Sequence, residues 1–346
     1  MMSNELILEF PFPEPPAPGA VIEVAPGLLW ARLALPFRLD HVNVYFIEDD
    51  DGWFIVDTGI ANRETKTAWQ ALFDGPMAGR RIKGLIVTHH HPDHIGLAGW
   101  LCETLDIPML TSRTSFLSCM TFAHSPALME ASEYTRFYTR HGMKPEIAAL
   151  VSTMGHDYLR MLSLPPHTYL RLHAGQHLTI GGRRFTVLTG DGRCPEQVML
   201  YAPDAGLLLA ADQVIEKITP NISVMAFEPL GDPLGDLLAS LKDLRDKVAP
   251  DVLVLSGHRL PFYGLHERCA DLALHHEERC ALISEACKGG AHSANDLIPV
   301  LFHRPLDPHE LSFAFSEVLA HLNHMVARGD LQWQTEEDGS LRVTGA

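Results

Sequence analysis

The segment Thr88–His94 constrains the fold more than any other part of the chain, because it reads Thr-His-His-His-Pro-Asp-His directly after an apolar run. That run, Ile82–Thr88, is predicted to be a strand, and a helix is predicted to begin near Ile95. Imidazoles two positions apart on an extended strand end point to the same side, and the following turn brings Asp93 and His94 round to face them. Imidazole and carboxylate donors together suit zinc, iron or manganese. The sequence therefore predicts a metal site at a strand end, with these ligands: His89, His91, Asp93 and His94.

Two further candidate ligands each follow an apolar run. Asp212 comes directly after Leu207–Ala211, and His258 comes directly after Val252–Gly257. Taken alone, Asp212 fits a cap or turn residue, and His258 fits a surface or core histidine. Ligands at neighbouring strand ends converge on one edge of a β-sandwich, however, and the shared placement favours a role for both in the metal site.

The composition limits the partners of the chain. The formal net charge is −16, from 27 basic and 43 acidic side chains, and such a surface repels phosphate backbones, so nucleic acid is an unfavourable partner. The segment Met1–Phe12 lacks the positive region of a secretory signal, and no apolar run approaches the roughly 20 residues of a membrane span. Six scattered cysteines without a CxxC pair are typical of reduced thiols. We expect a cytoplasmic protein with no membrane partner.

The pattern divides the chain into an N-terminal lead-in over residues 1–20, a main domain over 21–268 and a C-terminal domain over 269–346. The lead-in is Pro-rich and has no predicted helix or strand. Alternating apolar residues and turn signals in the main domain predict strands near residues 42–46, 53–56, 82–88, 184–188, 198–201, 207–210 and 252–255.

A stretch over about residues 112–165 has helical periods and no strand signal, as the spacing of Tyr134, Phe137 and Tyr138 illustrates. We interpret this stretch as a helical insertion in the main domain. Its apolar face has two compatible interpretations: it packs into the core, or it forms a lid that lines a pocket for an apolar substrate.

The C-terminal domain is predicted to be helical from about Asp271. Asp307 can cap a helix there, Glu310 completes a capping box, and Gly329 ends that helix. Short apolar segments on both sides of Asp338-Gly339 then predict a hairpin. Helices followed by a hairpin describe a winged helix, which we expect to pack on the main domain because no long linker precedes it.

Over roughly residues 20–265 the sequence resembles the metallo-β-lactamase superfamily of metallohydrolases, through its H-x-H-x-D-H arrangement and the two later ligands. The resemblance implies a four-layer αββα sandwich, an α/β fold with helices outside two stacked sheets. It also implies that His89 and His91 help to hold a first metal ion and that Asp93 and His94 hold a second. The carboxyl-terminal segment resembles the winged helix of some members of that family.

The resemblance also implies a role for three more residues. Asp212 matches an aspartate that bridges both metal ions, and His258 matches a histidine that completes the second pocket. Asp57, in Val56-Asp57-Thr58-Gly59, resembles an early aspartate that supports the ligands without binding the metal. A turn-stabilising role explains Asp57 equally well.

One loop departs from the family pattern Gly-Asp-Gly-His-Ser-Pro-Glu-His. Here Gly190–Gln197 reads Gly-Asp-Gly-Arg-Cys-Pro-Glu-Gln, so Arg193 stands where the family has a ligand of the first metal, and Gln197 replaces the second histidine. A guanidinium stays protonated and has no lone pair to donate to a metal. Asp191 or Cys194 could replace the ligand if the loop shifts. We expect one zinc ion rather than two, in the second pocket, or weak metal occupancy overall. Iron and manganese are the alternative metals, and Arg193 would supply part of the missing positive charge.

The resemblance implies a metal-dependent hydrolase of an ester, thioester or lactone, in which a metal-bound hydroxide attacks and Asp93 takes up the proton. A serine hydrolase is not the competing class, since the chain has no G-x-S-x-G. The expected substrate is a small molecule with an apolar part. One alternative is a degenerate member that binds a ligand or partner without turnover, for which Arg193 and Gln197 argue. Another is a nuclease, against which the acidic composition argues. A homodimer is compatible with the C-terminal module.

Overall fold

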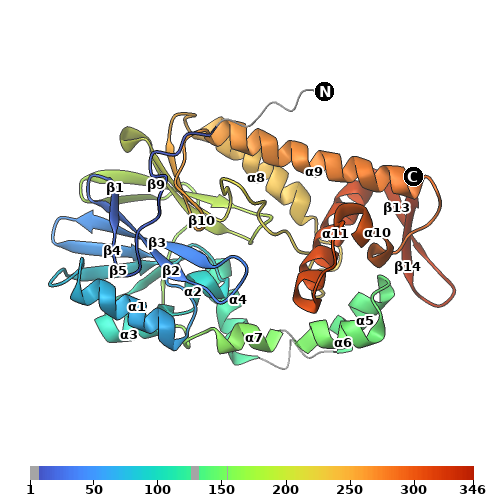
Figure 1. Ribbon diagram of the computed structural model, residues 1–346, viewed down its shortest axis with the longest axis horizontal. Coiled ribbons are helices and arrows are strands. Elements are labelled where there is room, and N and C mark those ends of the chain that lie inside the picture. The colour runs from blue at the N-terminus through green and yellow to red at the C-terminus, as the bar shows by residue number, and fades with distance from the viewer. Residues whose placement is uncertain (1–7, 126–131, 154) are drawn as a thin grey trace.

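Two β-sheets stack face to face, and helices cover the outer face of each, so the main body has four layers in the order αββα (Figure 1). The structure is a computed structural model that describes residues 8–125, 132–153 and 155–346. Residues 1–7 of the predicted lead-in, and residues 126–131 and 154 of the predicted insertion, lie outside the described residues. The predicted αββα class is confirmed.

The first sheet has seven strands in chain order. The first four pair antiparallel and the rest pair parallel. In chain order the strands are β1 (Ile22–Ala25), β2 (Leu28–Ala34), β3 (His41–Asp49), β4 (Gly52–Val56), β5 (Ile82–Ile86), β6 (Met109–Thr111) and β7 (Leu170–Arg171).

The second sheet has five strands in the order β12-β11-β10-β9-β8. Its strands pair antiparallel except for β11 and β12, which run parallel. They are β8 (His177–Ile180), β9 (Arg183–Gly190), β10 (Gln197–Ala202), β11 (Leu207–Ala211) and β12 (Leu253–Ser256), with a short 3-10 turn η2 (Pro203–Ala205) before β11. Every strand predicted in the main domain is present in one of these two sheets.

Alternation along the strands divides the apolar side chains between separate cores. In β3, Tyr45 and Ile47 point into the core between the sheets, whereas Val44 and Phe46 point to the outer face. Phe46 packs there against Trp69 of α1 (Arg63–Asp74), with ring centroids 5.8 Å apart. The helix α3 (Ala98–Leu105) covers the same face, and α8 (Pro233–Lys247) and α9 (Leu265–Cys287) cover the other sheet (Figure 1).

The predicted helical insertion consists of α4 (Arg113–His124), α5 (Ser132–Arg140), α6 (Pro145–Thr153) and α7 (Gly155–Arg160). Phe137 is buried in the same core as the C-terminal helices, and the Tyr138 ring lies 5.8 Å from that of Phe315. The aromatic residues singled out in the sequence therefore pack into a core. Other insertion residues, Phe122 and Tyr158, line a cavity. The core interpretation is confirmed for Phe137 and Tyr138, and a lid that lines a substrate pocket stays a prediction.

After α9 the chain forms α10 (Ala294–Leu301), α11 (Pro308–Arg328) and a hairpin of β13 (Leu331–Thr335) and β14 (Leu341–Gly345). The capping box of α11 is as predicted: Asp307 accepts from the backbone N–H of Glu310 at 2.8 Å, and Gly329 ends the helix with a left-handed φ of 83°. The helix α9 runs across the predicted boundary at residues 268/269. That boundary and the winged-helix assignment stay predictions.

All six cysteines are buried and free, as expected for reduced thiols. Within the described ranges, none of the helices combines the length and the apolar character that a membrane span requires.

Candidate metal centre

The predicted ligands meet at the carboxyl ends of strands. The His-rich motif leaves β5 and enters the short helix α2 (Pro92–Ile95), Asp212 directly follows β11, and His258 lies two residues beyond β12. Because β11 and β12 run parallel, their carboxyl ends lie at the same edge of the sheet. Two groups of potential ligand atoms form there, each with its atoms within 4.8 Å of one another: His89, His94 and Asp212, and Asp93, His94 and His258.

Four of these side chains form a closed ring of donor atoms. Oδ2 of Asp93 lies 3.4 Å from Nε2 of His94 and 3.3 Å from Nε2 of His258, and Oδ1 of Asp212 lies 3.4 Å from each of the same nitrogens. These separations exceed the roughly 2.9 Å of an ordinary N–H···O hydrogen bond. They match the spacing of about 3.3 Å between ligands held about 2.0 Å from a tetrahedral cation. Donors at these separations suit a divalent metal ion: Asp93, His94 and His258 form one group within 4.8 Å, and Asp212 adjoins both histidines.

Both histidines present Nε2 because their Nδ1 atoms are occupied. Nδ1 of His94 donates to Oδ2 of Asp57 at 2.8 Å, and Nδ1 of His258 donates to the backbone carbonyl oxygen of His41 at 2.8 Å. A carbonyl oxygen only accepts, so Nδ1 of His258 carries the proton and its Nε2 faces the other donors. Asp57 is held in turn by the backbone N–H and the hydroxyl of Thr88. Asp57 thus holds the His94 ring in place.

Charges in this ring are strongly coupled. Although burial acts to lower it, the Asp212 and Asp93 carboxylates raise the pKa of His258 to about 9. Against the same effect of burial, the neighbouring carboxylates hold the pKa of His94 well above its ordinary value. Burial opposes the ionisation of Asp93 and Asp212, but the histidines keep the pKa of each carboxyl well below its usual range. In the metal-free protein, protons on the imidazoles compensate the carboxylates, and a metal ion must displace them.

Four buried atoms of the predicted ligands have no hydrogen-bond partner among the described residues: Nε2 of His89, Nδ1 of His91, Nε2 of His94 and Oδ1 of Asp212. Unsatisfied buried donors and acceptors are rare in folded proteins and need an explanation. A cation held by His94 and Asp212 would satisfy the atoms of these two residues, which is a second reason to regard the centre as a metal site, whereas His89 and His91 belong to the first pocket.

The first pocket is occupied by Arg193. His89 and His91 approach each other with ring centroids 4.7 Å apart, but the side chain beside them is a guanidinium. Nε and Nη2 of Arg193 donate to Oδ2 of Asp212 at 3.2 and 2.9 Å, and Nη1 lies 3.4 Å from Nε2 of His91. Burial, reinforced by the Arg193 charge, holds the pKa of His91 well below its ordinary value. A cation therefore replaces a ligand where the family pattern has a histidine.

Asp191 and Cys194 do not replace the missing ligand. Oδ1 of Asp191 accepts a backbone N–H of its own loop at 2.7 Å, and Sγ of Cys194 lies 3.1 Å from Nδ1 of His90. Burial raises the pKa of the Cys194 thiol to about 12, so it stays protonated. Neither residue belongs to a metal-binding cluster found in the described part of the chain, and both line the adjacent cavity instead. Gln197 donates to Oε1 of Gln213 at 3.0 Å, beneath the loop.

Unusual backbone surrounds the ligands. Asp57, Ala211 and Arg259 have φ values of 64°, 47° and 65°, a region that costs of order 1–3 kcal/mol for a non-glycine residue unless its surroundings impose it. Gly257 lies so close to the centre that an added Cβ would be 2.5 Å from Oδ1 of Asp212 and 2.8 Å from Cε1 of His94. Gly257 was not predicted from the sequence, where its only signal is its position between a strand and a candidate ligand.

A cavity of about 640 Å³ opens beside His91 and Arg193. Apolar side chains from three parts of the fold contribute to its wall. They are Phe122 and Tyr158 from the insertion, Val224, Met225 and Phe227 from the segment between β11 and α8, and Phe313 from α11.

The same cavity contains four carboxylates: Asp191, Glu228, Asp232 and Asp236. Burial, together with repulsion from the other three, raises the pKa of Asp236. The one guanidinium that lines the cavity, Arg193, is already paired with Asp212. The cavity is therefore apolar in part and negatively charged in part.

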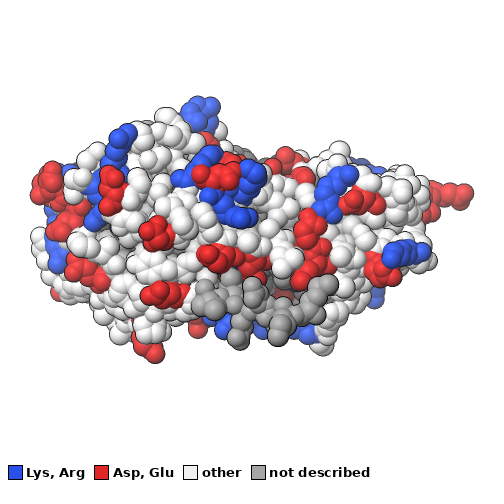
Figure 2. Space-filling model, turned by 90° about the horizontal axis from the view of Figure 1, so that it is seen from above, with Lys and Arg blue, Asp and Glu red and all other residues white. Residues whose placement is uncertain are grey.

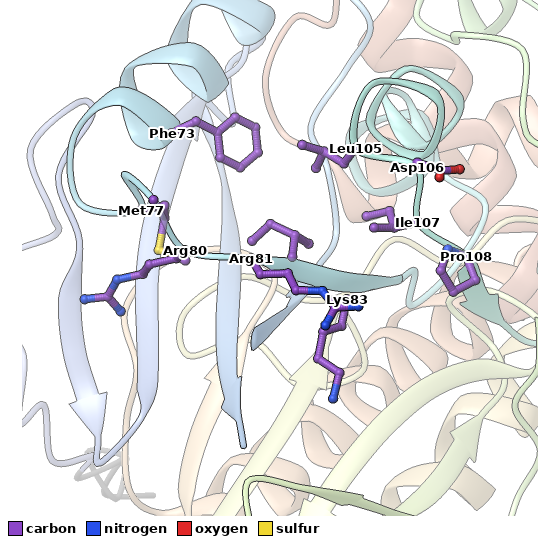
Figure 3. Close-up of a pocket in the computed structure, with 11 residues that line it drawn as sticks. Phe73, Met77, Arg80, Arg81, Lys83, Leu105, Asp106, Ile107 and Pro108 are labelled. Atoms are coloured by element: carbon purple, nitrogen blue, oxygen red, sulfur yellow. The ribbon is translucent and has the colours of Figure 1, made fainter. Parts of the chain in front are cut away.

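A second cavity, of about 620 Å³, lies at the amino end of β5, opposite the end that carries the His-rich motif. It combines apolar residues with basic ones, and Figure 3 shows the Arg80 and Lys83 side chains extending away from Phe73. Both cations are engaged elsewhere, since the Arg80 guanidinium lies 4.5 Å from the Trp53 ring and Lys83 pairs with Asp51. None of the metal-binding clusters found among the described residues lines this cavity.

Known proteins share this fold along the whole chain. Residues 37–258 match a family model described as "Metallo-beta-lactamase superfamily", and residues 280–346 match one described as "Metallo-beta-lactamase-like, C-terminal domain". The crystal structure of a beta-lactamase domain protein from Burkholderia ambifaria is 36% identical, with a TM-score of 0.89, and the match covers 100% of this chain and 99% of that one.

Two curated relatives are also similar. The "Linear primary-alkylsulfatase" of Pseudomonas sp. (strain ATCC 19151) is 25% identical over 222 residues, which are 61% of this chain and 40% of that protein, so this chain spans less than half the length of that relative. The "Probable metallo-hydrolase YqjP" of Bacillus subtilis (strain 168) is 23% identical over 309 residues, 86% of this chain and 91% of that one. With a family model matching residues 37–258 and the same fold throughout, the chain belongs to the metallo-β-lactamase superfamily.

Proposed function

We propose that this chain is a hydrolase that holds one divalent metal ion, zinc in the first instance, between Asp93, His94, Asp212 and His258. The observation that carries the proposal is the closed ring of donor atoms with separations of 3.3–3.4 Å. A divalent ion bound there supplies Lewis-acid chemistry, by acidifying a water molecule and polarising a carbonyl oxygen. Iron and manganese accept the same donors and are the alternatives.

The residues of the chain prepare this centre before a substrate arrives. Asp57 and the carbonyl of His41 fix the two imidazole rings, so that little reorganisation is needed when the metal binds. Asp93 is the most exposed donor of the ring, with 16% of its side chain accessible against 1% or less for the other three. We assign proton uptake during hydrolysis to the Asp93 carboxylate because it is ionised and the nearest of the four to solvent.

In this proposal, Arg193 supplies part of the positive charge that a second metal ion would provide. Its guanidinium holds Oδ2 of Asp212, which leaves Oδ1 for the metal, and it borders the cavity in which a substrate would lie. A fixed cation beside a reacting carbonyl stabilises the negative charge that develops on its oxygen. One metal and one guanidinium polarise a carbonyl less strongly than two metals, so easily cleaved ester, thioester and lactone bonds are the proposed substrates.

The cavity supports a substrate with an apolar part and without a negative charge. Phe227 and Phe313 offer aromatic surface, whereas Glu228 and Asp236 would repel an anion. An alkyl sulfate, which the name of the Pseudomonas relative would suggest, is anionic and is disfavoured by these carboxylates. We therefore favour a neutral or cationic acyl ester over a sulfate ester.

Two other functions stay as outcomes of the experiment. Binding without turnover would follow if the centre took up metal but cleaved nothing. A nuclease is disfavoured by the charge of −16, and on the face shown in Figure 2 the basic side chains of the described residues are interspersed with acidic ones rather than forming a continuous tract.

The test compares metal content with turnover. Purified protein is stripped with a chelator, reloaded with zinc, iron or manganese, and assayed on acyl esters, thioesters, lactones and an alkyl sulfate. We expect turnover of the acyl compounds that the chelator abolishes and that His258→Gln lowers by at least about 100-fold, while the exposed control His303→Gln behaves as the wild type. Metal binding without turnover of any acyl compound would favour the binding protein, and turnover of the sulfate alone would overturn the proposed bond type.

A further inference from the structure

A second cluster of metal-binding side chains lies between the long helices α9 and α11. The cluster consists of His276, Glu317 and His321. Each offers one ligand atom, and the three atoms lie within 4.8 Å of one another. Glu317 and His321 are four positions apart on α11, so they share one face of that helix, and His276 faces them from α9. His276 and His321 are 1% and 0% exposed, and the Glu317 side chain is 13% exposed.

Hydrogen bonds in this cluster determine where the lone pairs are. Nδ1 of His321 lies 2.7 Å from the backbone carbonyl oxygen of Glu317, so it carries a proton, and Nε2 of His321 has a free lone pair. That lone pair lies 3.2 Å from Nδ1 of His276. Nδ1 of His276 is therefore the nitrogen that faces this lone pair, and it can bind a metal ion when the proton of its ring is on Nε2.

We propose that His276, Glu317 and His321 form a structural zinc site that joins α11 to α9. Two imidazoles and one carboxylate are a donor set that zinc uses, with a water molecule in the fourth position. The 3.2 Å between the two imidazole nitrogens is close to the roughly 3.3 Å expected for two ligands of a tetrahedral zinc ion. The site goes beyond the proposed function, because it shares no residue with the centre at the strand ends.

Arg279 competes with the metal. Its Nη1 lies 2.6 Å from Oε1 of Glu317, and its guanidinium also lies 4.9 Å from the Phe302 ring. Zinc must share Glu317 with this cation or release it toward Phe302 and solvent, since the Arg279 side chain is 18% exposed. Arg279 therefore weakens zinc binding, and its removal should strengthen it.

The experiment counts metal ions and follows the spectrum of cobalt as a zinc substitute. Stripped protein is titrated with Co²⁺ and Zn²⁺, and metal per chain is measured for the wild type, His276→Gln and the neighbouring control His275→Gln. We expect His276→Gln to bind one ion fewer than the wild type and to lose one set of tetrahedral cobalt bands, whereas His275→Gln loses neither. Asp212→Asn, which damages the centre at the strand ends, should retain this second ion.

A gain-of-affinity variant keeps the proposal testable if His276→Gln fails to fold. Arg279→Gln removes the competing cation, so zinc should bind this site roughly tenfold more tightly. Equal metal content in the wild type and His276→Gln, or unchanged zinc affinity in Arg279→Gln, would overturn the proposal. The pair His276–His321 would then be a hydrogen bond between two helices and nothing more.

Discussion

Arg193 and Asp212 form a nearly buried ion pair inside the metal centre, with Nη2 of the guanidinium 2.9 Å from Oδ2 of the carboxylate. The pair explains how the chain tolerates the loss of a histidine ligand in the first pocket. Removing one partner of a buried pair leaves the other charge uncompensated, which typically costs about 3–5 kcal/mol. Arg193 thus contributes to the stability of the centre as well as to its charge.

Replacing Arg193 by histidine should restore the first pocket. The new imidazole would join His89 and His91, and Oδ2 of Asp212 would become available to bridge two ions. We expect one further metal ion per chain and faster ester hydrolysis, measured by elemental analysis and steady-state kinetics. The exposed Arg63→His variant is the matched control. Unchanged metal content would mean that the loop does not present residue 193 to the two histidines.

Asp57→Asn should weaken metal binding without removing a ligand. Its Oδ2 accepts the proton of Nδ1 of His94, and loss of such a supporting contact typically lowers metal affinity by about 10- to 100-fold. Competition with a chelator of known affinity measures the change. Asp50→Asn, at an exposed turn, should leave the affinity unchanged. An equal loss in both variants would show that Asp57 has no specific role.

Gly257→Ala should abolish metal binding while the fold persists. The added methyl group would lie 2.5 Å from Oδ1 of Asp212, so the carboxylate must leave the ring of donors. Circular dichroism checks the fold and elemental analysis checks the metal. Gly345→Ala, where an added Cβ meets nothing within 4 Å, is the control. Full metal content in Gly257→Ala would place the centre elsewhere.

Metal affinity should rise with pH up to about 9. The pKa of His258 is raised to about 9, so its imidazole is protonated at pH 7 in the folded protein. A metal ion competes with that proton. Below this pH, each metal ion bound releases protons; above it, the ring is already neutral and the dependence levels off. Calorimetry in buffers of different ionisation enthalpy measures the protons released. Metal binding without proton release at pH 7 would contradict the prediction.

Phe227→Ser should reduce the preference for long acyl chains. Phe227 lines the cavity and is 55% exposed without a ligand, so contact with a substrate would bury additional apolar surface. Since a fully buried aromatic side chain contributes roughly 1.5–3 kcal/mol, partial burial predicts a drop of about 3- to 10-fold in kcat/KM for long esters relative to short ones. Leu282→Ser, exposed on α9, is the control. An unchanged ratio would remove Phe227 from the substrate site.

Much of the fold and most of the candidate metal ligands could be predicted from the sequence, because patterns within short stretches of the chain indicate them. The strand ends that bear Asp212 and His258 are preceded by apolar runs, and the box of Asp307 and Glu310 marks the start of α11. The substitution at Arg193 was equally visible, since it breaks a known pattern. Each of these signals lies within a short stretch of the chain.

The features that escaped prediction depend on contacts between distant segments. The support of His258 comes from a backbone carbonyl of His41, which no side-chain pattern encodes. Carboxylates of the cavity come from separate segments, among them Asp191 and Glu228, and only the folded chain assembles them. The strands β1 and β2 were also not predicted, because the apolar run around Trp30 lacks clear alternation.

The helix α9 continues without a break from the second sheet to the C-terminal module, where α11 carries Phe313 to the cavity wall. In an α-helix each residue adds 1.5 Å of length and 100° of rotation. A single residue inserted into the middle of α9 would therefore turn the whole module relative to the sheets and carry Phe313 away from the cavity. The length of α9 therefore determines where Phe313 lies relative to the cavity, so a change far from the metal ligands can alter the shape of the cavity.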